Sequence, residues 1–380
     1  MTFSELHVAD NLCKALEKQN ISEPTYIQSR TYKNITDGRD LVACSSTGSG
    51  KTLAYLLPLI EKLDLSVKNV QILILVPTQE LAVQVNKQVE LLFVNAEIPS
   101  NSTFLIGEGN INRQIDALKL KPSVITGTPA RINQLISMKK LKVHEVKALV
   151  IDEADRLMNK THIETVLSIR KSLMKRTQVL LFSASIDKRT LSTANDLTFK
   201  PIIINEQNNR QTSPIPTTIK HIYVVTDRRE RIETLRKIAK ALNDDKTMVF
   251  INTRYDLDEA LQKLQYHSYN VGALSGDIDK QAKKKALEDF KSGKVNYLLG
   301  TDVAARGLQI DNVSTVINVN LPEDDNEYLH RAGRCGRNGN EGLCVSIITE
   351  NELSKIKRYQ KLFKINIIQK KLYNGKLVAK

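Results

Sequence analysis

The sequence contains no tryptophan, few aromatic residues and no apolar run long enough to span a membrane, although it extends over 380 residues. Cysteines are also few, and none belongs to a C-x-x-C pair: they are Cys13, Cys44, Cys335 and Cys344. We therefore expect neither a zinc site nor a disulfide framework, and we expect a reducing compartment. The N-terminus carries Glu5 and Asp10 and has no apolar core, which argues against a signal or transit peptide. A globular cytoplasmic protein without membrane contact is the expectation.

Acidic residues are scarce towards the C-terminal end. Residues 351–380 contain nine basic side chains against Glu352 alone, so this segment carries +8 (nine minus one) of the net charge of +14. The basic residues are Lys355, Lys357, Arg358, Lys361, Lys364, Lys370, Lys371, Lys376 and Lys380. Two interpretations stay open: a solvated helix with a frayed tail, or an extension that contacts phosphates. The apolar residues within 365–368 indicate that part of the segment packs or pairs.

Short apolar runs alternate with helical stretches along the whole chain. The strand-like runs are 41–44, 70–76, 123–126, 148–152, 178–182 and 202–204, then 219–225, 247–251, 269–274, 296–299, 314–319 and 343–348. This alternation is typical of parallel sheets covered by helices on both faces. A polar, proline-containing segment separates the two series. We predict an α/β domain over 1–204, a linker over 205–216, a second α/β domain over 217–350 and a basic extension over 351–380.

A loop rich in glycine and serine follows the first strand-like run. It reads Ser-Ser-Thr-Gly-Ser-Gly-Lys-Thr over residues 45–52 and precedes an apolar, helix-like stretch. Small residues let backbone N–H groups close around phosphates, which predicts a nucleotide site formed by Thr47, Gly48, Ser49, Gly50, Lys51 and Thr52. Lys51 would reach the β- and γ-phosphates, and the Thr52 hydroxyl would bind Mg²⁺. A strict P-loop has glycine at position 45, where this chain has serine, and a flexible turn is the alternative.

Two carboxylates stand where another apolar run ends. Residues 148–151 are Ala-Leu-Val-Ile, and Asp152 and Glu153 follow them. Open α/β sheets bind their ligands at the carboxyl ends of strands. An aspartate there can hold Mg²⁺ through water, and the adjacent glutamate can orient or deprotonate an attacking water. We therefore predict catalytic roles for Asp152 and Glu153 beside Lys51, and an ordinary acidic loop is the alternative.

The letters Asp-Glu-Ala-Asp at 152–155, taken with the phosphate-binding loop, resemble the DEAD-box ATP-dependent RNA helicases of helicase superfamily 2. The resemblance extends over nearly the whole chain. Residues 23–28 are similar to the Q motif of that family, and Phe3 stands 25 residues before Gln28. The resemblance implies that Phe3, Thr25 and Gln28 help to select ATP, because a glutamine amide can donate to and accept from the N6/N7 edge of adenine.

Four further segments resemble family motifs that contact RNA. Residues 77–82 and 126–131 are similar to motifs Ia and Ib, and residues 249–254 and 301–307 are similar to motifs IV and V. Such segments place N–H and hydroxyl donors against an RNA backbone. The residues for which the resemblance implies RNA contacts are Pro77, Thr78, Gly109, Thr128, Arg131, Thr253, Arg254, Gly276 and Thr301.

Residues 183–185 resemble motif III, and residues 330–337 resemble motif VI. The resemblance implies that Arg334 and Arg337 are arginine fingers, which in related phosphoryl transfers are worth about 10³–10⁵ in rate. It implies coupling roles for Asp155, Ser183, Ser185, His330 and Arg331. The implied fold is α/β, with two tandem RecA-like domains and the nucleotide site in the cleft between them. The implied cofactors are ATP and Mg²⁺.

The chain departs from the family's usual residues at several positions. Gln79 and Lys284 each stand in place of an arginine, and Ser185 stands in place of a threonine. Gln309 stands where the family commonly has an aspartate that accepts a hydrogen bond from the ATP ribose. A neutral amide accepts less strongly than a carboxylate, so we predict that Gln309→Asp tightens nucleotide binding. An equivalent neutral hydrogen bond from Gln309 is the alternative.

The resemblance implies an ATP-dependent RNA helicase in which ATP and single-stranded RNA jointly close the two domains and strain the neighbouring duplex. An ATP-gated RNA clamp or assembly platform with little strand separation is an alternative. DNA translocation on the same core is a third interpretation, which the Q motif argues against. By analogy with minimal family members, we expect a monomer with little RNA sequence specificity that acts in ribosome assembly or RNA remodelling.

Overall fold

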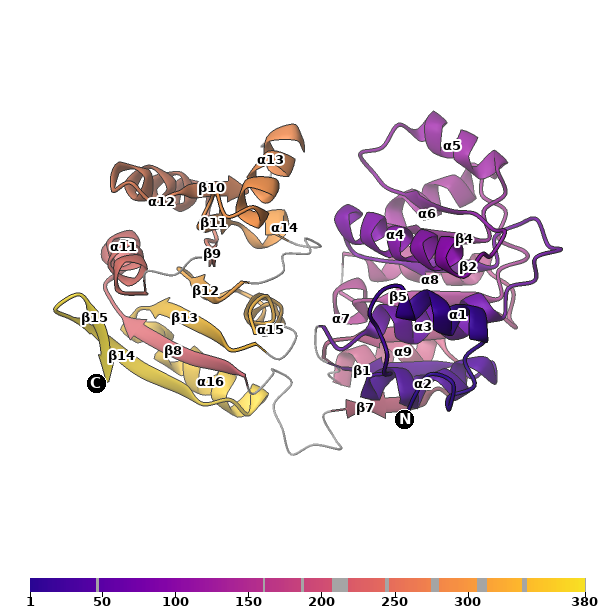
Figure 1. The fold of residues 1–380 in the computed structure, drawn as a ribbon, viewed down its shortest axis with the longest axis horizontal. Helices are drawn as coiled ribbons and strands as arrows, with labels where there is room; N and C mark the ends of the chain where they lie inside the picture. The colour runs from indigo at the N-terminus through magenta and orange to yellow at the C-terminus, as the bar shows by residue number, and fades with distance from the viewer. Residues whose placement is uncertain are drawn as a thin grey trace. The chain divides into compact units, whose positions relative to one another are not determined.

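The computed structural model describes residues 1–45, 48–159, 161–185, 188–206, 218–242, 246–274, 280–305, 313–336 and 340–379. The chain divides into two compact units, Met1–Arg210 and Gln211–Lys380 (Figure 1). Each unit contains one sheet with helices on both faces. Four residues with predicted site roles lie outside the described residues: Thr47, Gly276, Gln309 and Arg337.

The sheet of the first unit consists of seven parallel strands in the order β3-β4-β2-β5-β6-β1-β7. Their bounds are β1 (Leu41–Cys44), β2 (Ile72–Leu75), β3 (Ser102–Leu105), β4 (Val124–Gly127), β5 (Ala148–Asp152), β6 (Gln178–Ser183) and β7 (Ile202–Asn205). The central strands are buried along their whole length. Burial on both faces explains why these strands read as continuous apolar runs in the sequence.

The helices of the first unit cover both faces of this sheet. They are α1 (Asp10–Glu17), α2 (Tyr26–Thr36), α3 (Lys51–Glu61), α4 (Gln79–Asn95), α5 (Ile111–Lys119), α6 (Pro129–Ser137), α7 (Ala154–Leu157), α8 (Ile163–Ser172) and α9 (Lys188–Leu197). Helices α1 to α4 share a core with Leu41 and Ala43, whereas α6, α8 and α9 share another with Val42. Successive residues of a strand point to opposite faces, so β1 contributes to both cores.

The sheet of the second unit has eight strands in the order β10-β11-β9-β12-β13-β8-β14-β15. Their bounds are β8 (Ile219–Val225), β9 (Thr247–Phe250), β10 (Val271–Leu274), β11 (Tyr297–Gly300), β12 (Thr315–Asn318), β13 (Gly342–Ile348), β14 (Ile367–Tyr373) and β15 (Lys376–Ala379). The helical elements are η1 (Arg228–Glu230), α11 (Arg231–Leu242), α12 (Arg254–Tyr266), α13 (Lys280–Lys291), α14 (Asp302–Ala305), α15 (Asp325–Ala332), η2 (Glu350–Glu352) and α16 (Leu353–Phe363). One core contains α11 and α12, and the other contains α15 and α16.

Three strands of the structure were not predicted from the sequence: β3, β14 and β15. Strand β3 lies at the sheet edge and is only half-buried along most of its length, so it carries no continuous apolar run. Strand β14 contains Gln-Lys-Lys, which hides its strand character, and β15 pairs with it. Asn374 and Gly375 both have positive φ and connect these two strands. An Asn-Gly pair between apolar residues is a strong hairpin signal that would have revealed them.

The pairing of β14 with β15 is antiparallel, which corrects the expectation of purely parallel sheets. Strand β14 pairs in parallel with β8, so the basic C-terminal segment is part of the second sheet. In addition, Ile356, Tyr359, Phe363 and Ile367 are buried in the core of the second unit. The frayed-tail interpretation of this segment is therefore wrong for residues 351–379. None of the helices within the described ranges is long and apolar enough to cross a membrane.

Candidate nucleotide and RNA sites

The strand order of the first sheet separates two groups of predicted site residues. The strands β5, β6 and β1 are neighbours; β5 ends at Asp152, β6 ends at Ser183, and β1 is followed by the predicted phosphate-binding loop. The strands β3, β4 and β2 form the other half of the sheet, and the predicted RNA-binding residues follow them. Parallel strands bring their carboxyl ends to one edge, so both groups share this edge and occupy different halves of it.

The described residues of the predicted phosphate-binding loop have features that suit an anion. Gly48 and Gly50 have φ values of 80° and 87°, which a residue with a side chain rarely adopts. A Cβ on Gly50 would also clash with the Gln28 amide. The Ser49 hydroxyl is buried and has no hydrogen-bond partner within the described part of the chain. With the N-terminus of α3 beginning at Lys51, these features fit a bound phosphate group.

Gln28 connects the predicted adenine-binding segment to this loop. Its Nε2 donates to the Gly50 carbonyl at 3.1 Å, and its Oε1 accepts from the Thr25 backbone N–H at 2.9 Å. Thr25 and Gln28 also form the capping box at the start of α2. An amide has a second N–H and a second lone pair, so an adenine contact would add to these bonds. Phe3, in contrast, is buried in the core shared by α1 to α4, where its ring packs against apolar side chains.

Lys51 is hydrogen-bonded to Ser45 at the start of the loop. Lys51 Nζ donates to the Ser45 carbonyl at 2.7 Å, and the Ser45 hydroxyl donates to the Glu206 carboxylate. Burial lowers the pKa of Lys51, while the nearby Asp152 carboxylate opposes this shift. A phosphate can draw this amine away from the carbonyl, because charged acceptors make the stronger hydrogen bonds.

Asp152 and Glu153 lie at the carboxyl end of β5 in different environments. Burial, followed by the charge of Glu153, raises the pKa of Asp152 to about 6, and Lys51 opposes this rise. One oxygen of Asp152 accepts from the Glu153 N–H at 2.9 Å, and the other accepts from the Tyr55 hydroxyl at 3.0 Å. Glu153 has a φ of 50° and pairs with Arg156 at 3.1 Å. A left-handed glutamate is uncommon, and backbone conformations of this kind concentrate at functional sites.

The three predicted coupling residues of the first unit contact one another. Ser185 Oγ donates to an Asp155 carboxylate oxygen at 3.1 Å, and the Asp155 N–H donates to Ser183 Oγ at 3.3 Å. Ser183 Oγ in turn donates to the Ser185 carbonyl at 2.6 Å. These bonds connect the end of β6 to Asp155 on α7, the short helix that follows β5. The serine at position 185 thus has the hydroxyl that this contact needs.

Two predicted RNA-binding residues of the first unit, Gly109 and Arg131, meet in the loop of residues 106–110. Thr78 is the N-cap of α4 and follows Pro77, and Thr128 is the N-cap of α6. Arg131 is 8% exposed and donates to the Gly109 carbonyl at 3.0 Å and to the Gly107 carbonyl. The guanidinium of Arg131 therefore shapes this loop from within. Gln79 Oε1 accepts from the Glu108 N–H at 3.4 Å, so the residue that departs from the family also contacts the loop.

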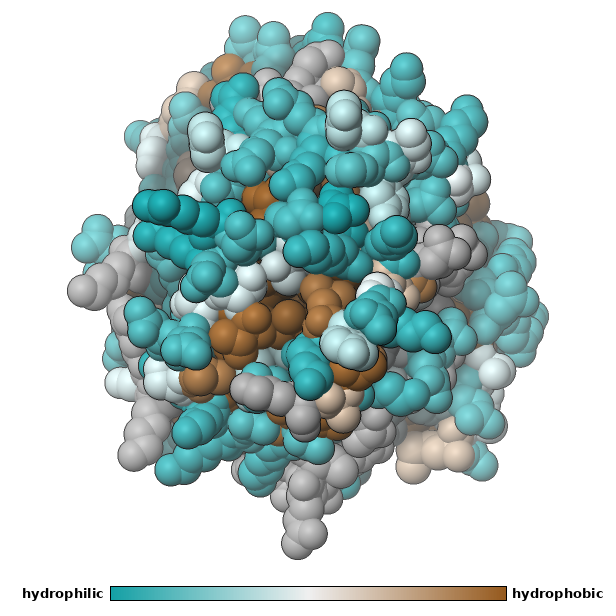
Figure 2. All heavy atoms as spheres, turned by 90° about the vertical axis from the view of Figure 1, so that its left-hand side faces the viewer, coloured by the Kyte–Doolittle hydropathy of each residue, from teal (hydrophilic) through white to brown (hydrophobic). Residues whose placement is uncertain are grey.

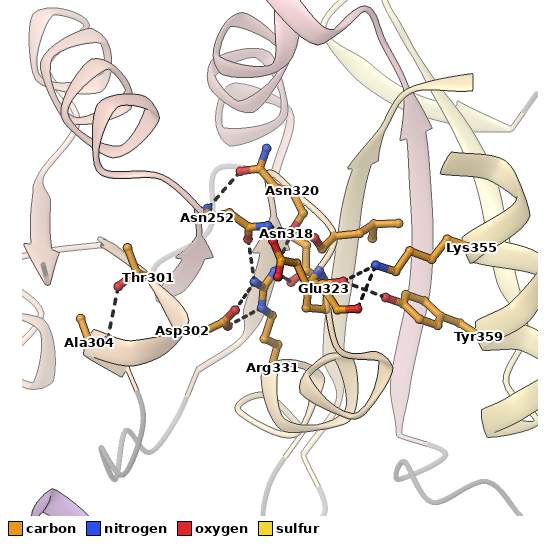
Figure 3. Close-up of polar contacts among 12 residues, drawn as sticks. Asn252, Thr301, Asp302, Ala304, Asn318, Asn320, Glu323, Arg331, Lys355 and Tyr359 are labelled. Carbon is orange, nitrogen blue, oxygen red and sulfur yellow. Dashed lines mark hydrogen bonds and ion pairs between the residues drawn. The ribbon is translucent and has the colours of Figure 1, made fainter. Parts of the chain in front are cut away.

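The predicted RNA-binding residues of the second unit follow neighbouring strands. Thr253 and Arg254 come after β9, and Thr301 comes after β11, its neighbour in the sheet. Thr253 is the N-cap of α12 and accepts from the Asp256 N–H at 3.1 Å. Thr301 accepts from the Ala304 N–H at 3.3 Å, as Figure 3 shows. Both hydroxyls thus stand at helix N-termini, where backbone N–H groups favour anions.

Arg331 is the centre of a buried hydrogen-bond network (Figure 3). Its guanidinium binds both oxygens of Asp302, each at 2.6 Å, and is 1% exposed. It also donates to Asn318 Oδ1 at 3.2 Å, to the Asn320 carbonyl at 2.7 Å and to Asn252 Oδ1 at 2.9 Å. This bidentate pair fixes α15 against the ends of β9, β11 and β12.

Arg331 thereby holds the segment that carries the predicted arginine finger. His330 is buried beside it on α15, and Arg334 follows two residues after the helix ends. Sequence patterns did not indicate Asn252, Asp302 and Asn318 as partners of Arg331, nor Tyr55 as a partner of Asp152. Asp302 was visible within the motif V segment, and Tyr55 was visible one helical turn after Thr52.

Comparison with known proteins places the chain in a family. The DEAD/DEAH box helicase family matches residues 25–194, and the helicase conserved C-terminal domain matches residues 230–339. The DEAD-box ATP-dependent RNA helicase CshC of Bacillus cereus is 38% identical over 97% of this chain and 92% of that protein. The probable ATP-dependent RNA helicase YfmL of Bacillus subtilis is 36% identical over 100% of this chain and 99% of that protein.

Solved structures support the same assignment. S. cerevisiae Dbp5 bound to RNA and ADP BeF3 has a TM-score of 0.87 and 27% identity, covering 97% of this chain and 95% of that one. Two sheets of RecA type, a DEAD/DEAH box domain and a helicase C-terminal domain define the class as two-domain helicase ATPases. The chain belongs to the DEAD-box family of ATP-dependent RNA helicases.

Proposed function

We propose that this protein hydrolyses ATP in response to RNA and uses the cycle to separate short RNA duplexes locally. The observation that carries the proposal is the meeting of Lys51, Asp152 and Glu153 at the ends of β1 and β5. Beside them, in the glycine loop, lies the Ser49 hydroxyl, which no other described residue binds. The strands β1 and β5 both pair with β6, which brings residues about a hundred positions apart in sequence to one site.

Lys51, Glu153 and Gln28 of the first unit have separate roles in this proposal. Lys51 leaves the Ser45 carbonyl for the phosphates, and the N–H groups at the start of α3 bind the phosphate oxygens. Glu153 orients the attacking water and accepts its proton. Gln28 binds the adenine base, and its hydrogen bond to the Gly50 carbonyl couples this binding to the position of the phosphate loop.

Magnesium is the expected metal of this site. Within the described residues no group of three or more histidine, cysteine, aspartate or glutamate side chains could hold a metal ion. Mg²⁺ suits a site with few protein ligands, because it keeps several waters and binds the phosphates of its nucleotide. Asp152 and the Thr52 hydroxyl supply the protein's oxygen ligands. When bound, the ion neutralises charge on the phosphates.

RNA is proposed to contact both units through their strand-end residues. Thr78 and Thr128 offer hydroxyls in the first unit, as Thr253 and Thr301 do in the second. Simultaneous binding of RNA and ATP would draw the two units together and bring Arg334 and Arg337 to the γ-phosphate. Backbone contacts of this kind read no base sequence, so RNA specificity is expected to be low.

Steady-state ATP hydrolysis tests the proposal. The purified chain is assayed alone, with single-stranded RNA and with DNA of the same sequence, and Glu153→Gln is assayed beside it. We expect stimulation by RNA, none by DNA, and a loss of about 10²–10⁴ in turnover in Glu153→Gln with nucleotide binding retained. Equal stimulation by DNA would instead favour a DNA translocase, and no stimulation by either would refute the proposal.

Duplex separation distinguishes unwinding from clamping. A short RNA duplex with a single-stranded flank, incubated with ATP under multiple turnover, should yield free strands. RNA held tightly with a non-hydrolysable ATP analogue, but never unwound, would instead identify an ATP-gated clamp. The unwinding role is expected to serve RNA remodelling or ribosome assembly, by a cytoplasmic monomer. Sedimentation of the purified chain and its co-migration with pre-ribosomal particles in a lysate test these finer points.

We also propose that the basic C-terminal hairpin adds non-specific RNA affinity. Lys371 on β14 and Lys376 on β15 are exposed, as are Lys361 and Lys364 just before the hairpin. The face of the second unit that carries α11, α12 and the hairpin is mostly hydrophilic, with one hydrophobic patch (Figure 2). Exposed lysines near a nucleic acid release counterions and raise affinity in a salt-dependent way.

Charge substitution is the suitable test of the hairpin, since deletion of residues 351–380 would remove buried core residues and β14. In Lys371→Gln/Lys376→Gln we expect the slope of log affinity against log salt to fall by about 2, with RNA-stimulated turnover at saturating RNA unchanged. The matched control is Lys171→Gln/Lys175→Gln, two exposed lysines of the first unit that precede β6 and so lie away from the carboxyl ends of its strands. Equal slopes in all three proteins would remove the hairpin from the RNA site.

A further inference from the structure

Tyr55 contacts both side chains that the proposed magnesium site uses. It lies on α3, one helical turn after Thr52, and is completely buried. Its hydroxyl donates to an Asp152 carboxylate oxygen at 3.0 Å, and the Thr52 side chain lies within reach of the same hydroxyl. Thr52 and Asp152 come from elements a hundred residues apart, and the Tyr55 hydroxyl is a bridge between them.

The position of this hydroxyl is fixed by packing. The Tyr55 ring lies 5.2 Å from the Phe182 ring, with an interplanar angle of 59°. Phe182 is itself fully buried on β6, between β5 and β1 in the sheet. A tilted aromatic pair in a close-packed core leaves a tyrosine few alternative rotamers. The bridge therefore belongs to a rigid part of the first unit.

The direction of the protons in the bridge follows from its chemistry. An ionised carboxylate only accepts, so Tyr55 must give its proton to Asp152. The phenolic oxygen is then free to accept, so the nearby Thr52 hydroxyl can donate its proton to Tyr55. A hydroxyl that binds a cation must direct its lone pairs to the ion and its proton elsewhere. The Tyr55 oxygen is the acceptor that Thr52 needs for this purpose.

The second oxygen of Asp152 also accepts a hydrogen bond. It accepts from the Glu153 backbone N–H at 2.9 Å, so each carboxylate oxygen already has one donor. The remaining lone pairs are available to the ion or to its waters. We infer that Tyr55 is a positioning residue that orients the oxygens of Thr52 and Asp152 toward Mg²⁺. The inference rests on the proposed function, since it requires that Mg²⁺ and nucleotide bind at this loop.

The chain contains a matched control for this tyrosine. Tyr32 on α2 is buried in the same core, and its hydroxyl donates to the Glu61 carboxylate. Glu61 is the last residue of α3, whereas Thr52 is the second, so the Tyr32 contact lies at the opposite end of that helix. Tyr55→Phe and Tyr32→Phe each remove one buried hydroxyl that is bound to a carboxylate. They differ in whether that carboxylate is at the proposed metal site.

Binding of a fluorescent, non-hydrolysable ATP analogue is the experiment. It is titrated into wild type and both variants over a series of Mg²⁺ concentrations and in excess EDTA. Loss of a residue that orients a metal ligand commonly costs 10–100-fold in metal affinity. We expect Tyr55→Phe to raise the half-saturating Mg²⁺ concentration by about 10-fold or more. Binding in EDTA should be unchanged, and Tyr32→Phe should match wild type in both conditions.

Other outcomes would overturn the inference. An unchanged Mg²⁺ dependence in Tyr55→Phe would mean that the bridge does not orient the ligands. An equal loss of binding with Mg²⁺ and in EDTA would mean that the tyrosine only supports the loop. Thermal unfolding of both ligand-free variants separates this case from general destabilisation, which would affect Tyr32→Phe as well. If wild type itself showed no Mg²⁺-dependent binding, the proposed function would fail together with the inference.

Discussion

The two units of the molecule share one strand order and differ in the residues at the carboxyl ends of their strands. Numbered from its own first strand, each sheet has the order 3-4-2-5-6-1-7, and the second sheet adds β15 at its edge. Strand β1 therefore corresponds to β8, and β5 corresponds to β12. Within each unit, the sheet sets where ligands can bind, since parallel strands bring their carboxyl ends to one edge of that sheet.

The chemistry at these equivalent positions is opposite in kind. Strand β1 leads into the glycine loop, while β8 leads into Thr226, Asp227 and the short helix η1. Strand β5 ends at Asp152, while β12 ends at Asn318, which accepts from Arg331. The first unit thus has a carboxylate at this strand end, and the second has an amide that accepts from the buried Arg331 guanidinium. Two sheets with the same strand order thus differ in chemistry because function resides in the residues after the strands.

The buried charges of the two units also differ in how they are compensated. Asp152 accepts two hydrogen bonds, yet burial still raises its pKa to about 6. Arg331 is more completely paired, with a bidentate carboxylate and three amide or carbonyl acceptors. An incompletely stabilised carboxylate is suited to receive a cation, whereas a saturated guanidinium is suited to hold structure.

The largest expected effect comes from removing Arg334, the proposed arginine finger of the second unit. In Arg334→Ala we expect RNA-stimulated turnover to fall by about 10³–10⁵. Nucleotide affinity measured without RNA should change little, because the first unit supplies the phosphate loop. Rapid-quench ATP hydrolysis and analogue titration measure the two quantities. Loss of nucleotide affinity without RNA, at unchanged turnover, would contradict the division of tasks between the units.

Arg331 is expected to matter for stability. In Arg331→Met the partners Asp302, Asn252 and Asn318 lose a buried donor, and breaking such a pair costs about 3–5 kcal/mol. Hydrogen exchange of β9 and β12 in mild urea measures the loss within the second unit, and exchange of β5 should remain unchanged. Lys220→Met, which breaks an exposed ion pair with Glu341, is the control and should show no resolvable change. If hydrogen exchange of β9 and β12 in Arg331→Met equalled that of wild type, the structural role of Arg331 would be refuted.

The Asp152 carboxyl predicts a pH effect in the first unit. Its folded pKa of about 6 lies above the usual 3.8, so the ionised form is disfavoured by folding. The stability of the ligand-free protein should therefore fall, by about 3 kcal/mol at most, as the pH rises from 4 to 6. Metal-dependent nucleotide binding should show the reverse trend and weaken below about pH 6, because a proton then competes for the carboxylate.

Asp152→Asn provides the comparison for that effect. The variant cannot ionise at this position, so its stability relative to wild type should increase between pH 4.5 and pH 7.5. Urea unfolding of both proteins at the two pH values measures this difference. A constant difference would show that Asp152 titrates near its ordinary value in the folded protein.

The smallest expected effect concerns Gln309. Replacement by aspartate should tighten binding of an ATP analogue in the presence of RNA by about 1 kcal/mol, or roughly 5-fold, since charged acceptors make stronger hydrogen bonds than amides. Binding to wild type and Gln309→Asp is measured with RNA saturating. The same comparison without RNA serves as the control, and identical affinities with RNA would mean that the amide already makes an equivalent bond.

Much of the site was visible in local sequence. The loop at 45–52 and the acids at 152–153 each follow a short apolar run, and the structure ends β1 at Cys44 and β5 at Asp152. The roles of the RNA-binding and coupling residues came from family resemblance and remain predictions. For Arg131 the structure shows a buried guanidinium bound to two loop carbonyls, which no local pattern reveals.

The sequence by itself determined the alternation of strands and helices, the positions of glycine in the phosphate loop and the family. These properties depend on local periodicity and on backbone angles that only certain residues adopt. The tertiary structure alone decided that Tyr55 meets Asp152, 97 residues away, and that β14 pairs with β8. Such contacts depend on the order of strands in a sheet, and strand order is set by the packing of the whole unit.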